Sequence, residues 1–281
     1  MQKPKFRIIR IGPLVSIPIL LAGCAPENHG SVVPLTLRDN FAVVVVEING
    51  KHVPLVLDTG NSVSVSLTKE AMERSGAIPL GDASKGMDVK GNLIESPRYK
   101  LARVQIGTAV FTDVIAELDV HDPSYQATQV GQEGFLGTEL LKGYNVMLDY
   151  PHRRMTLMST ANPSADCDGV AVPFSPAWKG EPATEVVPDA GRLVVWWDTG
   201  TPLSVLSRRY VQQTSWDVQQ ETVTSNKLLI GGVDFGPWPF EVWDVSLPPG
   251  FNGFIGYDFF ASHIVCMDFP EKKLVIQGSK K

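Results

Sequence analysis

Two aspartates stand out in this sequence because each begins the same tripeptide. An Asp-Thr-Gly occupies residues 58–60 and returns at residues 198–200, both times after an apolar run, and the Ser-Val pair at 64–65 recurs at 204–205. A single Asp-Thr-Gly is commonly an ordinary turn, since Asp and Gly both favour turns. Two copies in matching surroundings indicate an internal duplication. The sequence therefore predicts one site that receives a carboxylate from each half of the chain.

The chemistry open to two adjacent carboxylates is proton transfer to and from water. If Asp58 and Asp198 share a site they cannot both ionise cheaply, so one pKa rises and the pair holds one proton near its working pH. The charged carboxylate can take a proton from a water molecule between them, while the protonated one donates a hydrogen bond to a substrate carbonyl. Amide hydrolysis needs these two functions. The titration belongs to the pair rather than to either residue.

Strands are predicted around both tripeptides. Residues 41–48 form a β-branched run, Asn49-Gly50 is a strong hairpin signal, and residues 53–57 return to Asp58. The same order of strand, turn and strand precedes the second tripeptide, at residues 184–187, 188–191 and 193–197. Only short helices are expected, at residues 69–74 and 208–213. Closely spaced turns and few helices indicate an all-β barrel or sandwich.

A second repeated block fixes the period of the duplication. Gly-Phe-Leu-Gly at residues 134–137 aligns with Gly-Phe-Ile-Gly at 253–256, and the alignment continues without a gap through two hairpin-like patterns. These patterns carry Asp149 and Asp268 in matching places. Because each stands just before a turn, turn hydrogen bonding is the expected role of both carboxylates.

These four ordered blocks resemble the motifs of the clan AA aspartic peptidases. Each half resembles a retropepsin protomer, and the duplication resembles the bilobal, pepsin-like arrangement within one chain, over roughly residues 38–278. The resemblance implies an all-β fold with two β-barrel lobes and a cleft between them. It also implies that Asp58 and Asp198 form the catalytic dyad.

The resemblance assigns supporting roles around the dyad. The last glycine of each second block lies on a strand beneath the Asp-Thr-Gly loop, where a side chain would push into the loop. The threonine hydroxyls brace the opposite lobe's loop, and the loop glycines let main-chain amides approach the carboxylates. The residue directly after each Asp-Thr-Gly is usually small. The residues in these roles are Gly137, Gly256, Thr59, Thr199, Gly60, Gly200 and Thr201. Asn61 departs from the pattern. Its amide could bond Asp58, so the balance of the two pKa values stays open.

The two halves have unequal lengths. From the aspartate to the second-block glycine takes 79 positions in the first half and 58 in the second. Most of the difference follows the first helix, where the family places a flap that folds over bound peptide. We therefore expect a single flap, with its tip at Lys90, Gly91 and Asn92, although a plain surface hairpin would have the same pattern.

All six tryptophans fall in the second half, and Trp196-Trp197 directly precedes Asp198. By strand alternation, one of this pair is expected to face the core. The alternative is that these tryptophans form an aromatic wall that contacts an apolar side chain of the substrate.

The first residues have the layout of a secretory signal. Four positive charges precede an apolar stretch at residues 11–21, which ends in Leu-Ala-Gly-Cys at 21–24. This ending resembles a bacterial lipobox, which implies cleavage before Cys24, its acylation, for example with palmitate, and anchoring to the envelope. Because Ala25 follows the cysteine, sorting to the outer membrane, facing the periplasm, is expected. A single spanning anchor is the alternative.

Charge and cysteine content exclude several functions. Removal of residues 1–23 takes away four positive charges and moves the net charge from −5 to −9, so nucleic-acid binding is not expected. No CxxC, HExxH or clustered-histidine pattern indicates a metal, and no cofactor is expected. An extracytoplasmic disulfide between Cys167 and Cys266 is permitted, while the apolar stretch around Cys266 favours a small core residue.

The sequence thus divides into a signal peptide (1–23), a tether (24–37), an N-terminal lobe with a flap (38–160), a linker (161–168) and a C-terminal lobe (169–278). The function expected from it is that of a membrane-tethered, monomeric aspartic endopeptidase that acts on polypeptides with a water activated between Asp58 and Asp198. The competing class is a catalytically silent peptidase-fold lipoprotein that binds peptides or envelope partners.

Overall fold

The structure is a computed structural model, and it describes residues 30–120, 133–159, 167–177, 180–217 and 219–278. The expected signal peptide, Cys24 and most of the expected linker lie outside these residues. Among the described residues, no helix is long and apolar enough to cross a membrane.

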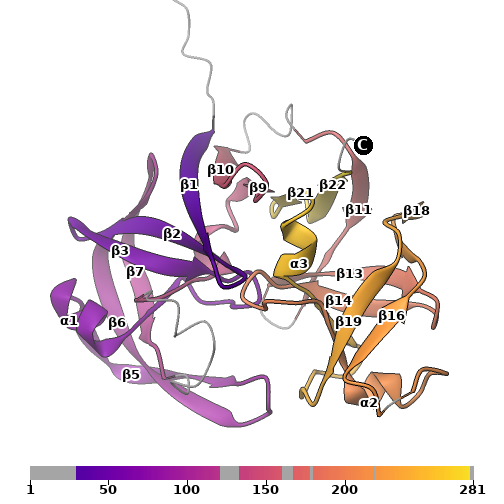
Figure 1. The fold of residues 1–281 in the computed structure, drawn as a ribbon. Coiled ribbons are helices and arrows are strands. Elements are labelled where there is room, and N and C mark those ends of the chain that lie inside the picture. Colours follow the sequence, from indigo (N-terminus) through magenta and orange to yellow (C-terminus); the bar gives the residue numbers. More distant parts are fainter. Residues whose placement is uncertain (1–29, 121–132, 160–166, 178–179, 218, 279–281) are drawn as a thin grey trace, which may run out of the picture.

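The first lobe consists almost entirely of strands (Figure 1). Its strands are β1 (Ser31–Arg38), β2 (Phe41–Ile48), β3 (Lys51–Leu57), β4 (Val65–Leu67), β5 (Ile78–Met87), β6 (Leu93–Ile106), β7 (Ala109–Leu118), β8 (Gly134–Leu136), β9 (Tyr144–Asp149) and β10 (Arg154–Ser159). Its helices are α1 (Lys69–Arg74) and the 3-10 helix η2 (Thr138–Leu140).

The second lobe repeats this plan with shorter elements. Its strands are β11 (Val170–Pro173), β12 (Ser175–Ala177), β13 (Glu181–Pro188), β14 (Leu193–Trp197), β15 (Val205–Ser207), β16 (Thr222–Ser225), β17 (Leu228–Ile230), β18 (Val233–Asp234), β19 (Trp238–Trp243), β20 (Gly253–Ile255), β21 (Ile264–Asp268) and β22 (Lys273–Gln277). Its helices are α2 (Arg208–Val211) and α3 (Tyr257–Phe260). The prediction of an all-β fold with two lobes is therefore confirmed.

The hairpin that delivers the first aspartate forms where the sequence predicts it. Asn49 and Gly50 both have positive φ angles, 48° and 80°, as a two-residue hairpin turn requires. The turn pairs β2 with β3 along their length, and buried side chains such as Val46 and Leu55 anchor the hairpin in the core. Hydrophobic burial of this kind fixes the register, because a slip of one residue would turn these side chains outward.

Each second-block strand is inserted between the two strands that flank an Asp-Thr-Gly loop. In the first lobe, β8 pairs parallel with β3 and antiparallel with β4. In the second lobe, β20 pairs in the same way with β14 and β15. This equivalence gives both loops the same support and establishes the internal repeat in three dimensions.

A sheet shared by both lobes joins them (Figure 1). Its order is β11-β22-β21-β9-β10-β1, so each lobe contributes three strands. At its centre, β9 and β21 run antiparallel with Met147 opposite Cys266, which are equivalent residues of the repeat. The two lobes are therefore related by an approximate twofold axis through this pair.

Two details of the sequence-based division need correction or completion. Residues 31–37 were expected in a tether, but they belong to β1, which pairs with β2 and β10. Alternating burial along β1, with Val33 and Leu35 inside, explains why this segment is held in the sheet. Cys266 is fully buried, as a core residue would be, and it also forms a disulfide with Cys167 across 99 positions.

Strand alternation separates the two adjacent tryptophans. Trp197 is fully buried in the second lobe, and its indole N–H donates to the Thr184 hydroxyl at 2.8 Å. Trp196 points to the opposite face of β14, where its ring lies against Phe251 and Phe254.

Candidate active site

The two Asp-Thr-Gly loops meet where the lobes join. Asp58 follows β3 and Asp198 follows β14, and each carboxyl group lies against the glycine of the opposite loop. A β-carbon on Gly200 would stand 2.5 Å from Asp58 Cγ, and one on Gly60 would collide with Asp198 Cγ. The absence of a side chain at both glycines is therefore what allows the two carboxyl groups to approach each other.

Four hydrogen bonds cross between the loops through two threonines. The Thr59 hydroxyl donates to the Trp197 carbonyl at 2.6 Å, and the Thr199 hydroxyl donates to the Leu57 carbonyl at 2.7 Å. Each hydroxyl also accepts from the main-chain N–H of the other threonine, at 3.1 and 3.0 Å. Both threonines are completely buried. These bonds fix one aspartate relative to the other.

Each carboxylate accepts a bond from its own loop, but the two surroundings differ. The Gly60 N–H donates to Asp58 at 3.0 Å, and the Gly200 N–H donates to Asp198 at 2.8 Å. The Thr201 hydroxyl adds a second donor to Asp198, at 2.6 Å. At the equivalent position of the first lobe, the Asn61 side-chain oxygen accepts from the Val63 N–H at 3.2 Å.

The pKa values of both carboxyl groups are raised, chiefly by burial. Burial raises the pKa of Asp58 well above its usual range, and the charge on Asp198 raises it further. Burial also raises the pKa of Asp198, while the hydrogen bond from Thr201 works in the opposite direction. A proton shared by the pair is the state that these surroundings favour.

The strands beneath the loops leave no room for side chains at the second-block glycines. A β-carbon on Gly137 would stand 2.7 Å from the Asn61 carbonyl oxygen, and one on Gly256 would stand 2.8 Å from the Thr201 carbonyl oxygen. Both would also meet the carbonyl oxygen two residues further along the same loop. The two glycines thus let strands pass directly under the catalytic candidates.

Two further acidic residues near the loops, Glu181 and Asp258, belong to no motif in the sequence. Glu181, at the start of β13, is 4% exposed, and its charge contributes to the raised pKa of Asp58. Asp258 accepts from the Ser204 hydroxyl at 2.8 Å, and that hydroxyl accepts in turn from the Gly256 N–H at 3.3 Å. The repeat of Ser64 as Ser204 was the one available signal for this support.

Tyr150 lies behind the loops. Its side chain is 1% exposed, and its ring packs against Tyr257 and Phe260. Burial raises its pKa, so the phenol stays neutral beside the dyad.

The expected flap is a hairpin of β5 and β6. The two strands pair up to Met87 and Leu93, and Gly91 at the tip has a φ angle of 87°. The Asp88 side chain holds the turn by accepting from the N–H groups of Lys90 and Asn92, at 2.9 and 2.8 Å.

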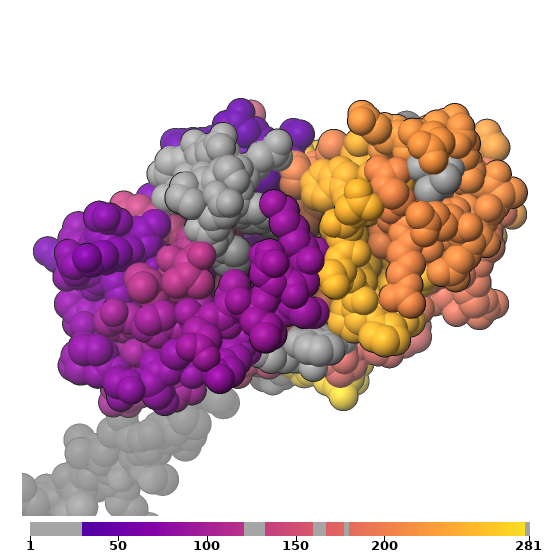
Figure 2. Space-filling model, turned by 90° about the horizontal axis from the view of Figure 1, so that it is seen from below, coloured from indigo at the N-terminus to yellow at the C-terminus, as the bar shows by residue number. Residues whose placement is uncertain are grey.

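The tip of this hairpin contacts the second lobe. The Ser246 N–H donates to the Val89 carbonyl at 2.8 Å, and a β-carbon on Gly91 would stand 2.9 Å from the Ser246 hydroxyl oxygen. From below, the purple hairpin meets the golden segment of the second lobe (Figure 2). The hairpin therefore bridges the two lobes, as a closed flap would.

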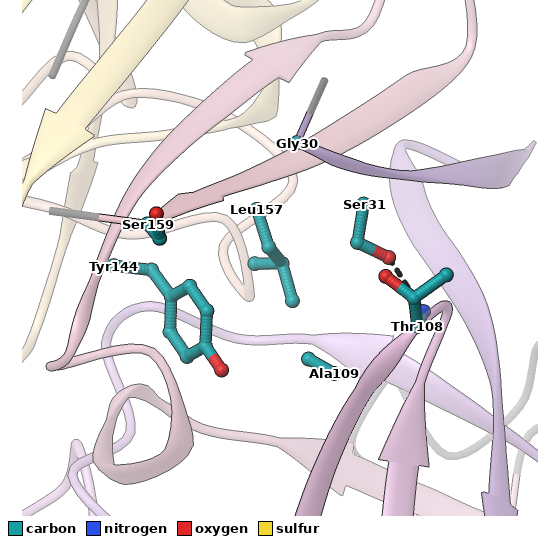
Figure 3. A pocket seen from close by; sticks show the side chains of 7 residues that line it. All are labelled: Gly30, Ser31, Thr108, Ala109, Tyr144, Leu157 and Ser159. Carbon is teal, nitrogen blue, oxygen red and sulfur yellow. Dashed lines mark hydrogen bonds between the residues drawn. The ribbon is translucent and has the colours of Figure 1, made fainter. Parts of the chain in front are cut away.

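Other candidate features lie apart from the dyad. Asp149 accepts from the His152 N–H and the Arg154 guanidinium, and Asp268 accepts from the Glu271 N–H, so both serve turns. A small pocket of about 190 Å³ opens at the start of β1 (Figure 3). It is lined by Gly30, Ser31, Thr108, Ala109, Tyr144, Leu157 and Ser159, none of which belongs to the Asp-Thr-Gly loops. Within the described ranges, no group of three or more potential ligands could hold a metal ion.

Comparisons with known proteins concern the sequence of the first lobe and the fold of both lobes. Residues 44–140 match a family model described as aspartyl protease. The structure is similar to the crystal structure of an aspartic proteinase from Irpex lacteus, with a TM-score of 0.60 and 13% sequence identity, over 89% of this chain and 97% of that one. No curated protein matches the chain. Residues 44–140 are thus similar in sequence to the aspartyl-protease family, and the two lobes share the fold of a pepsin-like aspartic proteinase.

Proposed function

We propose that this protein is an aspartic endopeptidase that hydrolyses polypeptides with a water molecule activated between Asp58 and Asp198. The observation that carries the proposal is the position of each carboxyl group against the glycine of the opposite loop. Two carboxyl groups held this close share one proton, which gives the pair an acid and a base at the same time. The aspartyl-protease family match supports a polypeptide as the substrate.

The reaction follows from the state of the pair. One carboxylate removes a proton from the water as its oxygen attacks the carbonyl carbon of the substrate. The protonated carboxyl hydrogen-bonds the carbonyl oxygen, on which negative charge develops. The cross-lobe bonds of Thr59 and Thr199 fix the distance between acid and base, so little reorganisation is needed when the charge moves.

A second candidate function is peptide binding without cleavage. Two observations favour it: the Asn61 side-chain oxygen is engaged by the Val63 N–H, and the flap is joined to Ser246 of the second lobe. The presence of two correctly supported aspartates favours catalysis over binding alone. A binding protein would have no need for two paired, buried carboxyl groups whose pKa values are both raised.

The envelope location is a separate part of the proposal. The lipobox-like ending at residues 21–24 supports acylation of Cys24 and an outer-membrane anchor that leaves the lobes in the periplasm. One chain supplies both aspartates, which supports a monomer. Metabolic labelling with palmitate should mark the wild-type chain and not Cys24→Ser. Equal labelling of both would refute the anchor.

The test of activity is digestion of a denatured protein mixture by the purified full-length chain in detergent, over a range of pH. Asp58→Asn and Asp198→Asn are compared with wild type. Asp268→Asn is the matched control, because Asp268 is also buried but serves a turn. We expect cleavage by wild type and by Asp268→Asn only. A wild type that never cleaves, or that cleaves no better than both dyad variants, would refute the enzyme and leave the binding function.

A further inference from the structure

The disulfide between Cys167 and Cys266 encloses most of the second lobe in one covalent loop. Cys167 lies just before β11, Cys266 lies in the middle of β21, and the 99 positions that separate them contain every element from β11 to α3. Asp198 lies within this loop of chain. A cross-link that closes so long a loop removes much of the conformational freedom of the unfolded chain. The bond therefore favours the folded second lobe over its unfolded state.

The second lobe is held less firmly than the first at its first strand. In the first lobe, β1 is one continuous strand that pairs with both β10 and β2. In the second lobe the same course is divided into two short strands, β11 and β12, which pair separately with β22 and β13. β1 buries Val33 and Leu35, whereas in β11, whose four residues are all described, Val172 alone is buried. Because less apolar surface holds this start of the lobe in the sheet, the disulfide stands where a covalent bond adds most.

The disulfide also packs against the first lobe. Cys266 is completely buried and lies opposite Met147 of β9 in the shared sheet. Together with Met158 of β10 and Val275 of β22, these residues form one cluster of buried side chains, against which the half-buried Cys167 packs. The bond thus joins the start of the second lobe to the part of the shared sheet where the two lobes meet.

The two cysteines differ in their access to solvent. Cys167 is the partly exposed end, so a thiolate that attacks the folded protein reaches this sulfur and must displace Cys266. The displaced sulfur would carry its negative charge among the side chains of Met147, Met158 and Val275, which solvate a charge poorly. The folded protein should therefore resist reduction, whereas the unfolded chain exposes both sulfurs.

We propose that this disulfide is a redox-dependent control of lobe assembly, in which the second lobe holds Asp198 beside Asp58 stably only after both cysteines have been oxidised. The oxidant is a disulfide, R–S–S–R. One cysteine thiolate attacks it and releases R–S⁻, and the second thiolate attacks the resulting mixed disulfide and releases the other R–S⁻. Two cysteine thiols thus lose two electrons and two protons, and the oxidant becomes two thiols. The effect on cleavage rests on the proposed function above.

Unfolding in urea tests the proposal without any need for cleavage. All six tryptophans lie between Cys167 and Cys266, so their fluorescence reports on the enclosed lobe. The full-length chain in detergent is compared with Cys167→Ser, which breaks the bond at its half-buried end, and with Cys24→Ser, which removes the cysteine outside the bond. We expect the midpoint to fall by about 1–2 M urea in Cys167→Ser and to stay unchanged in Cys24→Ser. Equal midpoints in wild type and Cys167→Ser would overturn the proposal.

Refolding of the wild-type chain gives the same comparison without a substitution. One preparation is refolded in dithiothreitol and the other with oxidised glutathione, which should link the tryptic peptides 155–179 and 228–272. In the reduced preparation we expect hydrogen exchange to be at least about tenfold faster in β14, the strand that leads to Asp198. Equal exchange in the two preparations would contradict the control of assembly.

The persistence of the bond is measured by its rate of reduction. Dithiothreitol should reduce the folded, oxidised chain at least about tenfold more slowly than the same chain in concentrated urea. Equal rates would show that burial of Cys266 does not protect the bond. If the chain cleaves polypeptides, only the oxidised preparation should do so at the full rate, and equal cleavage by both preparations would overturn the proposal. A wild type that never cleaves would refute the proposed function, while unfolding and exchange would still decide whether the disulfide controls assembly.

Discussion

Thr59 and Thr199 exchange hydrogen bonds across the boundary between the lobes, each hydroxyl accepting from the other's main-chain N–H. Each hydroxyl also donates to a carbonyl of the opposite strand. The distance between the two aspartates is therefore set by the contact between lobes and not by either lobe alone. The candidate active site therefore forms only when the two lobes are packed together.

Loss of one threonine hydroxyl should weaken this contact. Thr199→Val keeps the side-chain shape but leaves the buried Thr59 N–H and Leu57 carbonyl without their partner. We expect a decrease of about 2–3 kcal/mol in the free energy of unfolding in urea. Thr224→Val, at an exposed position of β16, is the control and should change it by less than about 0.5 kcal/mol. Equal effects of the two substitutions would show that the cross-lobe bonds contribute nothing special.

A side chain at a second-block glycine should disturb the loop above it. Gly256→Ala brings a β-carbon against the Leu203 and Thr201 carbonyl oxygens, which are main chain and have little freedom to move. The expected cost is about 1–3 kcal/mol of stability, with loss of activity. Gly143→Ala meets no atom within 4 Å and serves as the control. Thermal or urea unfolding of both variants measures the difference, and a Gly256→Ala as stable as Gly143→Ala would disprove the steric role.

The flap should open more readily when its bond to the second lobe is removed. Ser246→Pro deletes the N–H that the Val89 carbonyl accepts, whereas Ser246→Ala keeps it. Trypsin cleavage after Lys90, at the exposed tip, measures opening. Loss of one hydrogen bond of about 1 kcal/mol should raise the cleavage rate roughly fivefold in Ser246→Pro and leave Ser246→Ala at the wild-type rate. Identical rates in both variants would mean that this bond does not hold the flap.

The raised pKa of Asp58 has a consequence for stability. Its folded-state pKa lies above its unfolded value, so its contribution is fully present below the unfolded pKa and is lost as pH rises through the folded pKa. Asp58→Asn does not ionise and escapes this loss. The variant should therefore gain in unfolding free energy relative to wild type as pH rises from acid to neutral. Urea unfolding at a series of pH values measures this, and a difference that stays constant or shrinks with rising pH would be contrary to the account.

The sequence predicted the parts of the site that the duplication repeats. The paired aspartates, the threonines and the two second-block glycines all recur with the same neighbours, and the hairpin at Asn49-Gly50 is a local signal. The resemblance to aspartic peptidases then gave the cross-lobe arrangement. The alternation of apolar residues that buries one face of β1 is also visible in the sequence, but its position close to the expected tether favours a linker over a strand.

The remaining features depend on contacts between distant residues. The acceptor of Asn61 turns to Val63 because the loop places that N–H within reach, which residue type alone could not decide. Glu181 and Ser246 belong to no repeated block. Each lies near the first lobe only because the two lobes pack together. The disulfide of Cys167 needs the shared sheet to bring Cys266 near it.

The most direct test of the central claim is whether the two aspartates act as one unit. With one identified peptide substrate, kcat/KM is compared among wild type, Asp58→Asn, Asp198→Asn and the double variant, each shown to be folded. The account predicts that each single variant loses at least about 10³-fold and that the double variant loses no more, because residues acting as a unit are non-additive. A single variant with wild-type activity, or losses that multiply in the double variant, would contradict a composite dyad.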